Sequence, residues 1–143
     1  MLYVENSFEL KKTLKSITFT VHPDDIQASF DVRALYPSIP IKKALEITRE
    51  RLYSDESLQT QTKWKPDDII TLKLQEICLE THFKTLDGRI FTQTDGTQIG
   101  KSISGPLADI YMDWFENEHT YSESNEFRDH LKIWKSSRDD VYM

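Results

Sequence analysis

The segment 29–40, with the sequence SFDVRALYPSIP, constrains the fold of this chain more than any other stretch. Apolar and polar residues alternate from residue 26 to residue 32, which is the pattern of a half-buried β-strand. Asp31 ends this alternation, and Tyr36 follows five residues later in a turn bounded by prolines. The pattern therefore predicts a carboxylate at the exit of a strand, with an aromatic ring nearby.

Composition and charge narrow the classes of protein that this chain can belong to. Its 143 residues correspond to one domain on length alone, and 24 acidic against 18 basic residues give a net charge of −6. Affinity for a phosphate backbone comes largely from Lys and Arg, so the charge argues against a self-sufficient nucleic-acid binder. A metal-dependent core can nevertheless be acidic, because its carboxylates bind cations.

The location of the protein is also constrained by the sequence. No apolar run approaches the length of about 18 residues that a membrane span needs, and the N-terminus lacks the pattern of a signal peptide. The single cysteine, Cys78, excludes an internal disulfide framework and is expected to be a small buried residue rather than a reactive thiol. We therefore expect an intracellular protein, nuclear or cytoplasmic, that is neither secreted nor a partner of membranes.

Hydrophobic periodicity and turn residues predict an α+β fold. An antiparallel sheet is expected to carry helices on one face, and a small hairpin is expected beside it. The predicted elements are a helix over 7–17 capped by Ser7, a strand over 26–32, a helix over 41–53, a loop over 54–65, a helix from Pro66 to about 81, a hairpin over 83–94 with a two-residue Asp-Gly turn, a helix over 103–118 and a strand over 131–134.

Two further segments carry candidate functional residues. The first is a glycine-rich loop that leads into a helix and contains Gly96, Gly100 and Ser104; such a loop could also merely cap the helix. The second is the acidic pair Asp139-Asp140, although adjacent acids often lie in solvated turns. If these acids converged with Asp31 on neighbouring strands, their oxygen ligands would suit two Mg²⁺ ions, about 4 Å apart, for phosphoryl transfer.

Taken in order, the three segments resemble motifs A, B and C of reverse transcriptases. The 17-residue stretch GTQIGKSISGPLADIYM is similar to the family's glycine-rich loop and the helix that follows it. The Ile-Pro-Ile sequence at 39–41, the predicted hairpin and the Trp-Lys sequence at 134–135 resemble the Penelope-like branch of retroelements in particular. The resemblance covers nearly the whole chain and implies an antiparallel palm sheet of the ferredoxin-like or RRM-like kind.

The resemblance also implies roles for individual residues. Asp31, Asp139 and Asp140 would be the catalytic and metal-binding carboxylates, with Asp31 and Asp139 binding two Mg²⁺ ions, or Mn²⁺, as cofactors and Asp140 supporting them. Tyr36 would exclude a ribose 2′-hydroxyl, a role that can coexist with packing in the core. The substrate-binding loop would comprise Gly96, Gly100 and Ser104. The implied reaction transfers a nucleotide from a dNTP to a primer 3′-hydroxyl, with an RNA template and a DNA primer as partners of the full-length protein.

The chain departs from the family pattern at Lys101, where a small residue is usual, and at Ser137 and Arg138, where an aromatic and then a small or apolar residue are usual. Segments corresponding to the thumb and most of the fingers are not evident. The expectation is therefore a single partial reverse transcriptase domain over 1–143, a palm with a little of the fingers, that is inactive by itself.

Two alternatives accompany this interpretation. A family B DNA polymerase shares the pattern Asp-x-x-x-Leu-Tyr-Pro-Ser-Ile, but no Lys-rich second motif and no Asp-Thr-Asp sequence follows here. The second alternative is a catalytically inactive or domesticated palm remnant that acts as an acidic interaction module. The substitutions at Ser137 and Arg138 favour this alternative, and the retained Asp31, Tyr36 and Asp139-Asp140 disfavour it.

Overall fold

The computed structural model describes residues 4, 6–18, 20, 22–70 and 82–143, and it shows a mixed α+β protein with small antiparallel sheets. The elements are α1 (Ser7–Ser16), β1 (Ser29–Asp31), α2 (Leu35–Ser38), α3 (Ile41–Ser54), α4 (Leu58–Gln61), α5 (Pro66–Asp68), β2 (His82–Lys84), β3 (Ile90–Thr92), α6 (Ser104–Phe115), the π-helical turn η2 (Glu116–Thr120), the 3₁₀ turn η3 (Arg128–His130), β4 (Lys135–Ser137) and β5 (Asp140–Tyr142).

The single domain expected over residues 1–143 comprises two compact units. The first unit combines Met1–Arg33 with Met112–Met143, so it contains both ends of the chain. The second unit is the continuous segment Ala34–Tyr111. Asp31, Asp139 and Asp140 lie in the first unit, whereas Tyr36 and the glycine-rich loop belong to the second.

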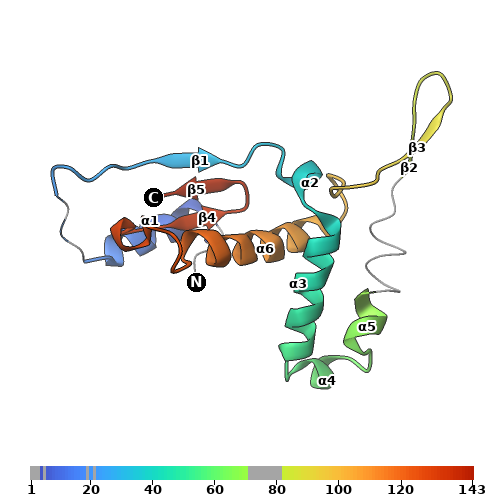
Figure 1. Ribbon diagram of the computed structural model, residues 1–143, viewed down its shortest axis with the longest axis horizontal. Coiled ribbons are helices and arrows are strands. Elements are labelled where there is room, and N and C mark those ends of the chain that lie inside the picture. The colour runs from blue at the N-terminus through green and yellow to red at the C-terminus, as the bar shows by residue number, and fades with distance from the viewer. Residues whose placement is uncertain (1–3, 5, 19, 21, 71–81) are drawn as a thin grey trace. The chain divides into compact units, whose positions relative to one another are not determined.

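The first unit is built on a three-stranded antiparallel sheet in the order β1-β5-β4 (Figure 1). Phe30 lies opposite Val141, and Val141 lies opposite Ser136 on the other side of β5. The ladder between β1 and β5 continues at both ends, where Ala28 and Met143 exchange two hydrogen bonds of 2.9 Å and the Val32 amide donates to the Asp139 carbonyl at 2.7 Å. The sheet therefore joins the predicted first strand to the C-terminal hairpin.

The C-terminal hairpin differs from the sequence prediction. A strand was expected over 131–134, because apolar and polar residues alternate there, but the structure places β4 at Lys135–Ser137. Ser137 lies opposite Asp140, so only Arg138 and Asp139 form the turn. Strand position is decided by pairing with neighbouring strands as well as by local pattern. The expected 26–32 strand is likewise shorter as β1, although backbone bonds extend its pairing from Ala28 to Val32.

Two helices differ from prediction at their ends. Asn6, rather than Ser7, caps α1, because its side-chain oxygen accepts from the amides of Phe8 and Glu9. The helix predicted over 103–118 is α-helical only as α6 and then widens into η2, where the Tyr121 amide donates to the Glu116 carbonyl five residues back.

The second unit contains α3, which confirms the helix predicted over 41–53. Leu45 of α3 and Ile70, which follows α5, are buried together, and Ile41 and Leu52 of α3 pack against them. The loop predicted over 54–65 contains the short helix α4, with Leu58 buried. A helix was expected from Pro66 to about residue 81. The structure describes only its start, α5 with residues 69 and 70, and the rest of that helix, including Cys78, lies outside the described residues.

The hairpin of β2 and β3 is confirmed, but its turn is longer than expected. Lys84 lies opposite Ile90, the Thr85 amide donates to the Arg89 carbonyl, and the Gly88 amide donates to the Thr85 carbonyl. Gly88 has φ +88°, which glycine adopts without strain. These bonds make a three-residue loop with a left-handed glycine in place of the predicted two-residue turn.

Within the described ranges, no helix combines the length and the apolar character needed to cross a membrane.

Arg138 occupies the first position of the two-residue turn with φ 57°, a left-handed conformation that costs a non-glycine residue free energy. We predict that Arg138→Gly raises the free energy of unfolding by about 0.5–1 kcal/mol, because relief of this strain exceeds the extra entropy of glycine in the unfolded chain. Urea denaturation measures the change. Arg128→Gly is the control, since Arg128 lies in η3 outside this turn, and a loss of stability in Arg138→Gly would contradict the assigned conformation.

Candidate functional site

The candidate site of the first unit is a pair of carboxylates on adjacent strands. Asp31, the last residue of β1, lies directly opposite Asp140, the first residue of β5. Ala28 and Met143 form a hydrogen-bonded pair three positions away, and bonded and non-bonded pairs alternate along an antiparallel ladder. Asp31 and Asp140 are therefore a non-hydrogen-bonded pair, the closer kind, in which opposite Cα atoms lie about 4.5 Å apart.

This pair lies on the open face of the sheet. Both aspartates are exposed, whereas Val141 and Ser136, which point to the opposite face, are buried to 4% and 5% exposure. Like charges directly opposite each other destabilise a sheet. A bound cation would remove this penalty, because each carboxylate would then face a positive charge instead of its neighbour.

Asp139 holds a different position. It is the second residue of the turn between β4 and β5, and its backbone carbonyl accepts from the Val32 amide. The structure therefore brings Asp31 and Asp140 together as side chains, and it brings Asp139 alongside β1 through the backbone. Among the described residues, no group of three or more His, Cys, Asp or Glu side chains is placed to hold a metal ion.

The surface around the carboxylate pair is hollowed. A depression of about 260 Å³ has among its lining residues Asp31 and Asp140, together with Ser29, Lys135, Ser137 and Tyr142. The lining also includes the apolar residues Val4, Leu10, Phe30 and Val141, so the oxygen donors that hard divalent cations such as Mg²⁺ prefer form only part of it. The donor chemistry fits one cation shared by Asp31 and Asp140, with the remaining ligands supplied by water or by the phosphates of a nucleotide.

In the second unit, the structure brings together the glycine-rich loop and the turn that follows Arg33. The Thr97 amide donates to the Tyr36 carbonyl at 2.7 Å, and Gly96 packs directly against the backbone of Pro37. A Cβ atom on Gly96 would overlap the Pro37 carbonyl group, and φ at Gly96 is +75°. Only glycine fits this close approach, so the loop and the Tyr36 turn form one structural element.

The other predicted loop residues have different surroundings. Gly100 has φ +96°, and a Cβ atom there would meet nothing within 4 Å. Ser104 is 2% exposed, and its hydroxyl donates to the Gln98 carbonyl at 2.6 Å. Ser104 therefore holds the loop in shape from inside, whereas Gly96 fixes its contact with the preceding turn.

Asp95 is a residue of this loop that the sequence analysis missed. Its carboxylate accepts from the Ile41 amide at 3.2 Å and from the Gly96 amide at 3.0 Å. The first bond satisfies an amide at the start of α3, which Pro40 cannot cap with a side chain. An acid directly before a glycine was the available signal, because Asp-Gly sequences mark turns with side-chain capping.

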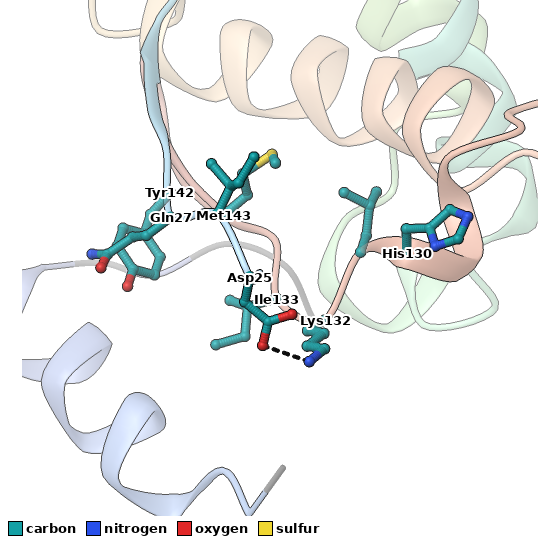
Figure 2. A pocket seen from close by; sticks show the side chains of 9 residues that line it. Asp25, Gln27, His130, Lys132, Ile133, Tyr142 and Met143 are labelled. Carbon is teal, nitrogen blue, oxygen red and sulfur yellow. Dashed lines mark hydrogen bonds and ion pairs between the residues drawn. The ribbon is translucent and has the colours of Figure 1, made fainter. Parts of the chain in front are cut away.

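A second depression of the first unit, of about 270 Å³, lies beside the last residues of β5 (Figure 2). Its rim carries an ion pair of 2.6 Å between Lys132 and Asp25. The hydrogen bond from Lys132, followed by that from the His22 amide, lowers the pKa of Asp25. The pair ties the segment before β1 to the segment before β4, so we assign it a structural role.

No protein-family model, curated protein or solved structure matches this chain.

The contact of Gly96 with Pro37 gives a test that uses a second glycine as its control. We predict that Gly96→Ala lowers the free energy of unfolding by about 2–5 kcal/mol, because the methyl group adds a backbone clash to the strain of a positive φ. Gly100→Ala has a similar φ but open space around it, so its loss is expected to be about 1 kcal/mol. Urea denaturation measures both, and equal losses would contradict the contact.

Proposed function

We propose that this chain is the palm of an RNA-directed DNA polymerase, of the Penelope-like reverse transcriptase type. The observation that carries the proposal is the pairing of Asp31 with Asp140 on the open face of the β1-β5-β4 sheet. Motif A of the resemblance supplies the first carboxylate and motif C the second. Residues 109 positions apart in the sequence are thus neighbours, as a polymerase palm requires.

The proposal assigns the carboxylates a role in binding divalent cations. Asp31 and Asp140 would hold Mg²⁺ or Mn²⁺, and Asp139 in the adjacent turn would complete the set. When bound, the cations supply charge neutralisation for the nucleotide phosphates and activation of the primer 3′-hydroxyl. The contribution of the chain is then the position of its carboxylates, since the nucleophile belongs to the primer.

The resemblance assigns substrate-binding roles to Tyr36 and to the glycine-rich loop, which lie together in the second unit. Tyr36 is half-buried, and its carbonyl is fixed by Thr97, so the backbone that carries the ring is held in place. This supports a role for the ring as a wall against the ribose 2′-hydroxyl. Gly100, around which a Cβ atom would meet nothing, would allow close approach of the template to the loop backbone, while Gly96 holds the loop against the Tyr36 turn. RNA template and DNA primer would need basic surfaces beyond this acidic chain.

Divalent-cation binding in the presence of nucleotide tests the proposal. We predict that the purified chain binds Mn²⁺, measured by electron paramagnetic resonance, and that dATP tightens this binding. Asp31→Asn and Asp140→Asn should each lower the Mn²⁺ affinity at least about tenfold, because each removes one of two paired carboxylates. Asp24→Asn, in the exposed turn before β1, is the control and should leave the affinity unchanged.

The outcomes separate the two functional alternatives. Loss of binding in both site variants, with an effect of dATP, supports a polymerase palm. Mn²⁺ binding that depends on Asp31 but does not respond to dATP supports a palm remnant without catalysis. Equal affinity in wild type, Asp31→Asn and Asp24→Asn would contradict the carboxylate site altogether.

A further inference from the structure

The covered face of the β1-β5-β4 sheet contains a buried carboxylate that the proposed reaction does not use. Glu116, the first residue of η2, is only 2% exposed. Its Oε2 atom accepts a buried hydrogen bond of 3.1 Å from the Ser136 hydroxyl of β4. Burial of a carboxylate is costly without compensating hydrogen bonds, so this position demands further partners.

Two complementary polar atoms lie on this face without partners. Among the described residues, neither Oε1 of Glu116 nor Nε1 of Trp134 has a hydrogen-bond partner, although both atoms are buried. The indole N–H can only donate, and an ionised carboxylate oxygen can only accept. Trp134 stands two residues before Ser136, and its ring stacks on Phe30, with centroids 6.3 Å apart and planes inclined by 25°.

The contacts of this group lead directly to the carboxylate pair. Phe30, against which Trp134 stacks, immediately precedes Asp31 in β1. Ser136, which bonds to Glu116, lies opposite Val141, which immediately follows Asp140 in β5. Trp134 therefore contacts the residue next to Asp31 in the sequence. Ser136, the partner of Glu116, pairs with the residue next to Asp140.

We propose that Glu116 is a positioning residue that bonds directly to Ser136 and, through one bridging water, to the Trp134 indole, and thereby fixes Asp31 opposite Asp140. The proposal deepens the proposed function and rests on it for the use of the carboxylate pair. The π-helical turn that begins at Glu116 supports it, because such turns often occur where a helix must direct a side chain at a functional site. A water with both partners would satisfy two buried groups at once.

The indole N–H resonance of Trp134 tests the contact itself. The chain has three tryptophans, so Trp134→Phe identifies the signal by its disappearance from a ¹H–¹⁵N spectrum. We expect Glu116→Leu to shift this resonance upfield and to speed its hydrogen exchange at least about tenfold, because the acceptor is lost. Glu116→Gln preserves shape and an acceptor oxygen, so it should shift the resonance but retain slow exchange. Glu118→Leu, on the exposed side of the same turn, is the control.

Two further measurements connect the contact to the site. The Val32 amide, which donates to the Asp139 carbonyl, should exchange at least about tenfold faster in Glu116→Leu, because the strand pairing loosens. Mn²⁺ affinity should fall about tenfold in Glu116→Leu and stay within about twofold in Glu116→Gln, as for other residues that orient ligands.

The outcomes distinguish this inference from the proposed function. An unchanged Trp134 resonance in Glu116→Leu and Glu116→Gln would overturn the positioning role even if Mn²⁺ binds. If Glu116→Leu does not fold, Glu116→Gln alone decides, since it is nearly isosteric. Altered Trp134 and Val32 signals in a chain that binds no Mn²⁺ would support the contact and its effect on strand pairing, and would contradict the proposed function instead.

Discussion

The antiparallel pairing of β1 with β5 determines where the chemically important side chains lie. Side chains alternate between the two faces of a sheet, so a slip of one residue in this register would turn Asp140 to the covered face and expose Val141. The burial of Val141 and Ser136 opposes such a slip, as do the backbone bonds at Ala28 and Val32. The same register that buries the covered face therefore places two like charges together on the open face.

Local sequence signals identified the elements whose pattern is strong by itself. The periodic helix at α3 and the Asp-Gly hairpin were predicted, because each follows from residues close in sequence. The position of β4 was missed, because Lys135, Ser136 and Ser137 have little β propensity and acquire their strand conformation from β5. Adjacent acids suggested a turn at Asp139-Asp140, but the turn consists of Arg138 and Asp139 and lacks the glycine or asparagine that marks most two-residue turns.

In the candidate site, too, local sequence signals identified some residues, whereas others depend on contacts between distant segments. From the sequence, Asp139 was predicted to be the metal-binding partner of Asp31, with Asp140 in support, whereas the strand register places Asp140 directly opposite Asp31. Glu116 was missed, although it continues a buried stripe at four-residue spacing with Ala108 and Met112. An acid on such a stripe was the signal for a buried polar contact. Its partner Ser136 could not have been found, because the two residues meet only through the folded sheet.

The most direct test of this account is the location of a bound paramagnetic ion. Mn²⁺ added to the ¹⁵N-labelled chain broadens the amide signals of nearby residues, and these can be assigned along the sequence. The account predicts that the strongest broadening centres on Asp31, Val32, Asp139 and Asp140 and disappears in Asp31→Asn. Broadening centred on another acidic segment, such as Asp67 and Asp68 of α5, would contradict the account, as would broadening that persists in Asp31→Asn.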